Sequence, residues 1–263
     1  MKMKKTLLAL AVVTYSMVSG SVMAGDWTTS GTGGSVDFGG SLTPVAKVTP
    51  WEVQVGSAVN GLNADITKGQ SAVDISVNQA IPVLGIRTTA EKIFNGQSGI
   101  SPQIDFKGAV DIDGFSNGKT TLTLDVKNDK DQKIGEMTTR SFVAGAESSW
   151  KTSGGSGKKY LSAGSAGQAF FGGLAKNTSQ IGNGWDLVQS IDPEYQANYD
   201  AQGAKNLSAA GSETFSNTAS TFSGYYGAGI QAGSVIHITL DTPAAGDAPI
   251  AWKASLPVTV SYQ

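Results

Sequence analysis

The chemistry open to this chain is limited by its single histidine, His237, and by the absence of cysteine. A Ser-His-Asp site would have to use His237, whereas thiol nucleophiles and cysteine-bound metals are excluded. His237 lies in a segment of alternating polarity, on the face opposite Ile236 and Ile238. A lone histidine in such a segment is typical of a surface or edge-strand position. We therefore expect no catalytic residues and no enzymatic activity.

Two patterns typical of ligand loops are present only in part. Asp125, Asp129 and Asp131 lie close together, as acidic residues do in a calcium loop, but the glycine and glutamate that such a loop requires are not in register. Residues 31–40 are rich in glycine, yet no strand precedes them as one precedes a dinucleotide or phosphate loop. We expect a solvated turn at the aspartates, and neither a metal nor a cofactor.

The first 24 residues have the organisation of a secretory signal peptide. Three lysines, Lys2, Lys4 and Lys5, precede an apolar stretch over residues 6–18, and small residues lead to Ala24. The alternative is a short membrane anchor, but the apolar stretch is shorter than the roughly 20 residues that cross a bilayer as a helix. We expect cleavage after Ala24 and export of the remainder through a bacterial inner membrane.

The charge of the chain argues against nucleic acid as a partner. The formal net charge is −2, and three of the 19 basic residues belong to the predicted leader. The exported part is therefore more acidic than the whole chain. Proteins that bind nucleic acid present an excess of lysine and arginine to its phosphates, so we expect no binding to nucleic acid.

Alternation of apolar and polar residues, the pattern of half-buried strands, recurs along most of the chain. The sequence has 34 glycines and 15% charged residues. Residues 128–133 are polar and turn-prone between two alternating segments, which indicates a hairpin. Many short strands separated by turns predict an all-β sandwich. The clearest alternating segments are residues 51–55, 73–77, 104–106, 122–126, 235–240 and 252–262.

The alternation is lost over residues 148–220, which we interpret as a partly helical insertion into the sandwich. Residues 151–159 are rich in glycine, serine and lysine and indicate a linker. Residues 163–174 are rich in small side chains, which favours a short helix or a run of turns.

Aromatic residues gather in the second half of this insertion. Trp185 lies at the start of a segment with helical spacing, and Asp192-Pro193-Glu194 is a typical helix start. Tyr195 and Tyr199 follow, four residues apart, and would share a face of that helix. One interpretation is that Trp185, Tyr195 and Tyr199 form a small core of the insertion, since aromatic residues at helical spacing usually pack.

The two ends of the exported chain carry strands that have one apolar face each. Near the start, alternation places Val36, Phe38, Gly40 and Leu42 on one face, after a flexible polar tail. At the other end the same alternation places Leu256, Val258, Val260 and Tyr262 on one face. A sandwich whose terminal segments can both pair with sheet edges is a candidate for strand exchange between subunits.

In several segments the sequence resembles the major subunits of chaperone–usher fimbriae of the enterobacterial K88 type, and within them the capsule-like surface antigen subunits. The resemblance runs nearly the whole length, and the missing cysteine pair also fits this type. Ile250 departs from the pattern, since many such pilins have glycine at that distance from the end. The segments that carry the resemblance are residues 4–11, 21–27, 34–41, 171–174, 227–230 and 257–262.

The resemblance implies an incomplete immunoglobulin-like sandwich that a donor strand completes. A periplasmic chaperone would fill the gap first, with Leu256, Val258, Val260 and Tyr262 at its contact. The N-terminal strand of the next subunit would replace the chaperone at an outer-membrane usher, giving a filament of identical subunits on the cell surface. The implied organisation is a signal peptide (1–24), a donor-strand extension (25–43), the pilin core (44–147 and 221–263) and the insertion (148–220).

The resemblance also implies that the major subunit is itself an adhesin whose insertion binds host glycoconjugates. The side chains with ring faces suited to a sugar are Trp150, Trp185, Tyr195 and Tyr199. The alternative is a purely structural filament or capsule-like surface subunit without a receptor site of its own. The residues form no ligand constellation that identifies the sugar or the pocket.

Overall fold

The computed structural model describes residues 38–42 and 48–263. The chain divides into two compact units, Met1–Ala46 and Lys47–Gln263. The predicted signal peptide and Val36 of the predicted donor strand lie outside the described residues, and of the predicted extension only residues 38–42 are described. The second unit holds every strand and helix of the described residues.

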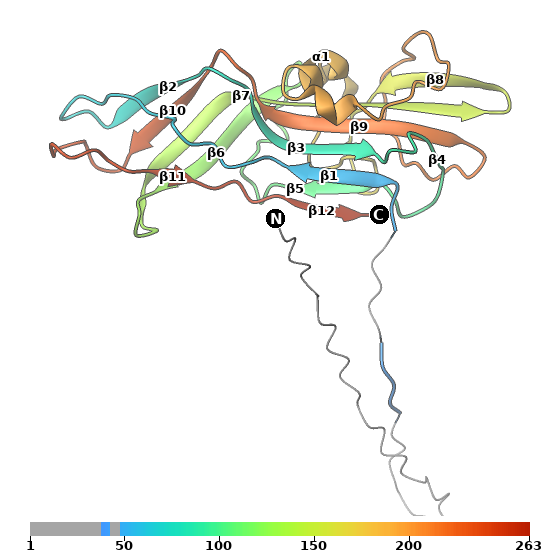
Figure 1. Ribbon diagram of the computed structural model, residues 1–263, viewed down its shortest axis with the longest axis horizontal. Helices are drawn as coiled ribbons and strands as arrows, with labels where there is room; N and C mark the ends of the chain where they lie inside the picture. Colours follow the sequence, from blue (N-terminus) through green and yellow to red (C-terminus); the bar gives the residue numbers. More distant parts are fainter. Residues whose placement is uncertain (1–37, 43–47) are drawn as a thin grey trace, which may run out of the picture. The chain divides into compact units, whose positions relative to one another are not determined.

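The regular secondary structure of the described chain is mostly β, with all strand pairs antiparallel (Figure 1). None of its helices is long and apolar enough to cross a membrane. The strands are β1 (Trp51–Val55), β2 (Ala72–Val77), β3 (Ile81–Thr88), β4 (Phe94–Asn95), β5 (Pro102–Asp105), β6 (Lys119–Lys127), β7 (Lys133–Thr152), β8 (Gly155–Tyr160), β9 (Thr221–Ile230), β10 (Ser234–Leu240), β11 (Lys253–Ala254) and β12 (Thr259–Tyr262). The helical elements are α1 (Gly184–Gln189) and the 3-10 turns η1 (Thr178–Gln180) and η2 (Pro193–Gln196).

The strands form an open sandwich, as the alternation predicted. The main sheet has the order β1-β3-β9-β7-β10-β2, with β6 and β8 also paired to β7, β4 to β9, and β11 to β6. Strand β12 pairs with β5 in a second, two-stranded sheet. The helical elements α1 and η2 lie over β7 and β9, on the side away from β5 and β12 (Figure 1).

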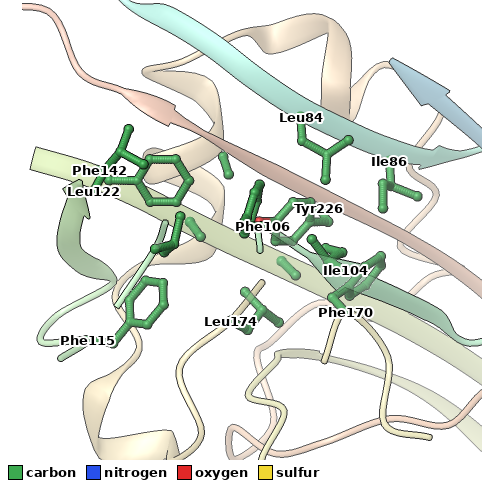
Figure 2. Packing of buried hydrophobic residues seen from close by; sticks show 14 of the residues in the cluster. Leu84, Ile86, Ile104, Phe106, Phe115, Leu122, Phe142, Phe170, Leu174 and Tyr226 are labelled. Carbon is green, nitrogen blue, oxygen red and sulfur yellow. The ribbon is translucent and has the colours of Figure 1, made fainter. Parts of the chain in front are cut away.

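The apolar faces of several predicted strands form the core between these layers. Leu122 and Val126 of β6 are buried, as are Ile75 of β2 and both Ile236 and Ile238 of β10. Burying a side chain of this size contributes roughly 1.5–3 kcal/mol. Figure 2 shows how residues from distant segments, such as Phe106, Phe142, Phe170 and Tyr226, meet in this core.

Strand β1 forms as predicted, but its apolar face is only partly covered. Register pairs Val53 with Ile86 and Val55 with Leu84, so both valines point to the core side. Leu84 and Ile86 are fully buried, whereas Val53 and Val55 are 41% and 59% exposed. Core-facing residues that remain exposed indicate that no neighbouring strand covers this edge of the sandwich.

Strand β7 takes part in two hairpins, and one of them corrects the sequence analysis. The predicted hairpin around residues 128–133 is present, with β6 and β7 on either side. Residues 151–159, interpreted as a linker, instead form the β7–β8 hairpin, in which Trp150 pairs with Gly157. A Cβ at Gly157 would lie 2.3 Å from the indole of Trp150. The glycine therefore makes room for a ring and does not give flexibility.

The helical segment of the insertion forms a cap on the sheet. Asp192 caps η2, its carboxylate accepting a hydrogen bond from the Glu194 amide at 2.9 Å, as the helix-start pattern predicted. The 3-10 turn ends at Gln196, so Tyr199 lies beyond it and not on the same helix as Tyr195, contrary to the prediction. Residues 163–174 are turns.

Candidate functional site

A long groove opens on the edge of the sandwich that no strand covers. Its volume is about 740 Å³, and its two walls are residues 55–63, which continue β1, and residues 249–258, which contain β11. Side chains of the main sheet form its floor, and nearly all of them are aliphatic: Ile81, Val83, Leu122, Leu124, Met137, Ile230 and Ile236.

Both walls of this groove have an unpaired strand edge. Within residues 48–263, β1 pairs with β3 alone, β11 with β6 alone and β12 with β5 alone. A free edge presents backbone N–H and C=O groups that can hydrogen-bond to an added strand. The groove thus combines an apolar floor with backbone partners on its walls.

The C-terminal segment alternates as predicted, although it is not one continuous strand. Trp252, Ala254, Leu256, Val258, Val260 and Tyr262 are half-buried against the core, and the residues between them are exposed. Residues 255–258 separate β11 from β12, because here the chain passes from pairing with β6 to pairing with β5.

The start of β1 and the end of the chain lie at the same end of the groove. Trp51, the first residue of β1, donates its indole N–H to the Ile100 carbonyl at 2.7 Å. The backbone of Gln263 exchanges two hydrogen bonds, of 2.9 and 3.1 Å, with the next residue, Ser101. The first residue of β1 therefore lies at the Gln263 end of the groove, and Trp252 marks the opposite end.

The described residues of the predicted donor strand carry exposed apolar side chains. Phe38 is 92% exposed and Leu42 is 99% exposed. A Cβ added at Gly40 would meet no atom within 4 Å. Large apolar side chains with this exposure gain free energy from burial in a partner.

The residues predicted to bind a receptor do not form one site. Alternation along β7 places Trp150 on the face of Phe222, in the main core, while Trp185 and Tyr199 lie with the cap on the other face. The rings of Trp185 and Tyr199 are 6.4 Å apart, and Trp185 is 40% exposed. On that face the two rings form an aromatic surface, which we call the Trp185 face.

Tyr195 lies beneath this surface as a packing residue. It is 2% exposed, and a Cβ at Gly85 or Gly227 would come within 2.2 or 3.0 Å of its ring. Burial, together with the nearby Asp192 carboxylate, raises the pKa of Tyr195 to about 12. Its ring face is therefore occupied by the sheet.

A buried carboxylate, Glu147, supports the Trp185 face from below. The carboxylate is 2% exposed and accepts hydrogen bonds from the hydroxyls of Tyr199 (2.8 Å) and Tyr225 (3.0 Å). The Lys158 ammonium lies 3.8 Å away. Burial raises the pKa of both tyrosine hydroxyls, and the negative charge of Glu147 raises them further. These hydroxyls therefore stay protonated and act as donors.

Comparison with known proteins identifies the family of the chain. Residues 3–263 match the K88 fimbrial family model, described as "Fimbrial, major and minor subunit". The chain is 31% identical to K88 fimbrial protein AD of Escherichia coli over 99% of this chain and all of that protein. It is 35% identical to K88 fimbrial protein AB over 67% of this chain and 66% of that protein. It is 28% identical to the K88 minor fimbrial subunit FaeI over 99% of this chain and all of that protein. The organism is Escherichia coli in each case.

The chain belongs to the K88 family of fimbrial subunits. The resemblance seen in the sequence is thereby confirmed at the level of the family, and the open all-β sandwich agrees with the predicted fold class. Both major and minor subunits belong to this family.

The remaining sequence candidates of this fimbrial subunit have structural partners. His237 is exposed on β10, and its Nδ1 lies 2.6 Å from a carboxylate oxygen of Asp74 on the neighbouring strand. Asp125 pairs with Lys133 and Asp131 with Lys253, and the bond from Lys253 lowers the pKa of Asp131. Within the described residues, no group of three or more acidic or histidine side chains is arranged to hold a metal ion.

Local residue patterns did not reveal two features of the fimbrial subunit, the buried Glu147 and the groove, although the family resemblance implied a gap in the sandwich. Glu147 and Tyr225 lie 78 residues apart and meet only through the β7–β9 pairing. One available signal was the isolated acid in an otherwise uncharged stretch, residues 141–150. The groove itself had no local signal, since its floor comes from five different strands.

Proposed function

We propose that this chain is the major structural subunit of a surface fimbria and polymerises by donor-strand exchange, without enzymatic activity. The observation that carries the proposal is the apolar groove between two unpaired strand edges. Adding an extended segment to such an edge is β-strand addition, of which the donor-strand complementation of pilins is a known case. The family membership supports assembly into a filament of subunits.

The donated strand has the length and the pattern that the groove requires. Residues 36–42 extend over about 20 Å at 3.3 Å per residue, as does the wall from Trp252 to Val258. Each segment presents four residues on one face. Burying Val36, Phe38 and Leu42 contributes roughly 1.5–3 kcal/mol each, and each backbone hydrogen bond adds about 0.5–1.5 kcal/mol. Ordering the strand costs about 1–2 kcal/mol per residue and offsets part of this gain.

The positions of the two chain ends set the direction of the donated strand. Strand β1 begins at the Gln263 end of its own domain, so in a head-to-tail filament the extension that precedes it reaches the next subunit at that subunit's Trp252 end. Leu42 then lies nearest Trp252 and Val36 nearest Val258. The donated strand then runs antiparallel to the C-terminal segment. The contact is heterologous, since it joins different surfaces of the two subunits, so repeating it gives an open filament and not a closed ring.

Before polymerisation, a periplasmic chaperone fills the same groove in this proposal. Leu256, Val258, Val260 and Tyr262 are half-buried and alternate along the wall, which suits pairing with a chaperone strand. The predicted signal peptide, residues 1–24, directs the chain to the periplasm. An outer-membrane usher then exchanges the chaperone for the next subunit at the cell surface.

A rearranged chain tests this proposal directly. Residues 35–43 are moved from the N-terminus to follow Gln263 through a short glycine linker, so that the chain fills its own groove. We expect a stable monomer without chaperone, measured by thermal unfolding and size-exclusion chromatography. The matched control carries the same segment with Phe38→Asp and should aggregate. The proposal would be excluded if the Phe38→Asp control were as soluble as the rearranged chain. It would also be excluded if a chain without residues 35–43 were as soluble as the rearranged chain.

A second proposed function is adhesion to host glycoconjugates, and the observation that favours it is the Trp185 face. Trp185 is 40% exposed and rests edge-on against Tyr225, at 6.0 Å between ring centroids. An exposed ring held by a packed neighbour and surrounded by polar groups is suited to a sugar's CH face. Asn183 and Asp186 lie beside it on α1 and offer hydrogen-bonding groups.

Glycan arrays probed with assembled filaments test the adhesion proposal. Trp185→Ala should abolish binding, whereas Trp150→Ala on the opposite face of the sheet should retain it. Using assembled filaments ensures that both variants are folded. If Trp185→Ala filaments bind as the unaltered filaments do, the Trp185 face is not the receptor site. If unaltered filaments bind no glycan, the subunit is a structural one.

A further inference from the structure

A second groove lies beyond the Trp252 end of the first. Its volume is about 520 Å³. Val73 and Ile75 of β2 and Ile238 and Leu240 of β10 form its floor, and Trp252 closes one side. The floor is apolar. Ile75 and Ile238 are already buried, at 3% exposure each, whereas Val73 and Leu240 are half-buried and supply the accessible part of the floor.

The two grooves are continuous. Asn63, Pro249, Ile250 and Trp252 line both, and Ile250 at the junction is 42% exposed. The strands β2, β10 and β11 lie together at this end of the domain, away from the chain terminus (Figure 1). A strand that leaves the first groove past Trp252 therefore runs directly into the second.

We propose that the second groove binds residues 43–46 of the neighbouring subunit, with Val45 as the buried side chain. The proposal rests on the donor-strand function proposed above and extends the donated segment beyond Leu42. In the direction set by the chain ends, Leu42 lies nearest Trp252, and the residues that follow it lead out of the first groove. Val45 is three residues further on, about 10 Å at 3.3 Å per residue.

The chemistry of this segment fits the second groove. Residues 43–46 are Thr43, Pro44, Val45 and Ala46, without a charge, and match an apolar floor. Proline has no N–H to donate and ends strand pairing, so the segment can leave the sheet edge at Pro44 without losing a hydrogen bond. Lys47 follows, and the rim carries the carboxylates of Asp65 and Asp247 together with Lys68. Asp247 is already paired with Lys68, so Asp65 is the carboxylate that complements Lys47.

The occupied second groove would also fix the junction between subunits. Only residues 47–50 then remain between the bound segment and Trp51, the first residue of the donor's own sheet. Four residues span at most about 13 Å, so neighbouring domains would be held close together. A donated strand that ended at Leu42 would leave a junction of eight residues.

Cysteine cross-linking in assembled filaments tests the proposal, because the chain has no cysteine of its own. We expect Val45→Cys combined with Val73→Cys to give a ladder of disulfide-linked oligomers on non-reducing gels. Phe38→Cys with Leu256→Cys reports on the first groove and should also give a ladder. In the Val36→Cys and Val73→Cys pair, the two cysteines would lie at opposite ends of the grooves. This variant should therefore give only monomers on the gel.

The three pairs separate the possible failures. A ladder from the Phe38–Leu256 pair without one from the Val45–Val73 pair overturns the second-groove proposal and leaves donor-strand exchange standing. A ladder from the Val36–Val73 pair would show that the donated strand runs in the opposite direction, and it would overturn the proposal as well. No ladder from any pair counts against both proposals.

A second measurement uses the thermal dissociation of filaments. Val45→Asp places a charge on the apolar floor and should lower the dissociation temperature. Val48→Asp is the matched control, since Val48 is 92% exposed and lies outside the proposed contact. Equal dissociation temperatures for the two variants would overturn the proposal.

Discussion

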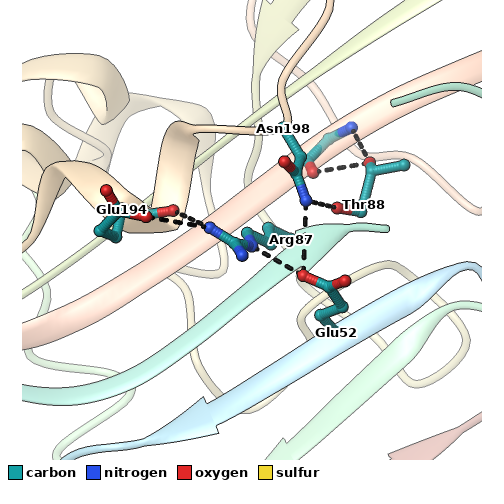
Figure 3. Close-up of polar contacts among 6 residues, drawn as sticks. Glu52, Arg87, Thr88, Glu194 and Asn198 are labelled. Atoms are coloured by element: carbon teal, nitrogen blue, oxygen red, sulfur yellow. Dashed lines mark hydrogen bonds and ion pairs between the residues drawn. The ribbon is translucent and has the colours of Figure 1, made fainter. Parts of the chain in front are cut away.

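The guanidinium of Arg87 bridges the edge strand β1 and the helical cap. Its Nε donates to the Glu52 carboxylate at 2.9 Å, and its Nη1 donates to the Glu194 carbonyl at 2.7 Å (Figure 3). Asn198 of the same cap donates its side-chain N–H to the Thr88 carbonyl at 2.9 Å. The cap is thereby joined to the strand that continues into the wall of the first groove.

Arg87→Ala should lower the free energy of unfolding of the rearranged monomer by about 1.5–3 kcal/mol, the range for hydrogen bonds to charged groups. The side chain is 29% exposed, so solvent replaces its bonds only in part. Arg140→Ala, on an exposed position of β7, is the matched control and should change stability by less than about 0.5 kcal/mol. Equal effects in chemical denaturation would show that the bridge contributes nothing.

Gly40→Val should block polymerisation while the chaperone complex still forms. In the proposed donated strand, position 40 would face the groove between two large side chains, where a glycine allows close approach of a neighbouring backbone. Within the described residues a Cβ at position 40 meets nothing, so the variant should not disturb its own subunit. The measurement is filament yield by electron microscopy, with the chaperone complex purified in parallel.

The adjacent glycine supplies the control for this experiment. A Cβ at Gly39 also meets no atom within 4 Å, but alternation places it on the opposite face of the donated strand. Gly39→Val should therefore permit filaments. Phe38→Asp should block them by burying a charge, and Ser41→Asp should be tolerated. Normal filaments from Gly40→Val and Phe38→Asp would contradict the donor-strand assignment.

Stability should fall as the pH rises above 10, because of buried tyrosines. Burial raises the pKa of Tyr195 from 10.0 to about 12, so between these values the unfolded chain loses a proton that the folded chain keeps. The unfolded state then binds fewer protons, and stability decreases with pH. Each such tyrosine contributes up to about 1.4 kcal/mol per pH unit. Tyr195→Phe should reduce the slope between pH 10 and 12, measured by urea unfolding of the rearranged monomer. An unchanged slope would refute this role for Tyr195.

Strands with one buried face and one exposed face could be predicted from the sequence, because their apolar and polar residues alternate. In β6 and β10, Leu122, Val126, Ile236 and Ile238 are buried where the pattern placed them. The pattern is local, because side chains of a strand alternate between two faces whatever their partners. It could not reveal that the core-facing Val53 and Val55 stay exposed, since that depends on which distant segments cover this edge of the sheet.

The insertion was harder to interpret because glycines there make room for packed side chains and do not indicate a flexible linker. Gly157 of the insertion accommodates the ring of Trp150. Gly85 and Gly227 lie outside the insertion, on β3 and β9, and accommodate the ring of Tyr195. A composition rich in glycine and serine predicts flexibility only where those residues contact nothing. The split of the aromatic candidates over two faces likewise follows from the β7–β9 pairing, which no local pattern specifies.

Val258→Asp should abolish both chaperone capture and filament formation. Val258 lines the first groove and is half-buried, so a carboxylate there would lie against an apolar floor that both partners must cover, at a cost of several kcal/mol. Thr259→Asp is the matched control, because Thr259 is exposed on the opposite side of the segment and should support both steps. Co-purification with the chaperone measures the first step, and filament yield measures the second.

Because β12 pairs with β5 from Thr259 onward, Val258 lies outside this ladder and its substitution leaves the backbone pairing in place. Wild-type chaperone yield from Val258→Asp would remove the C-terminal segment from the proposed contact.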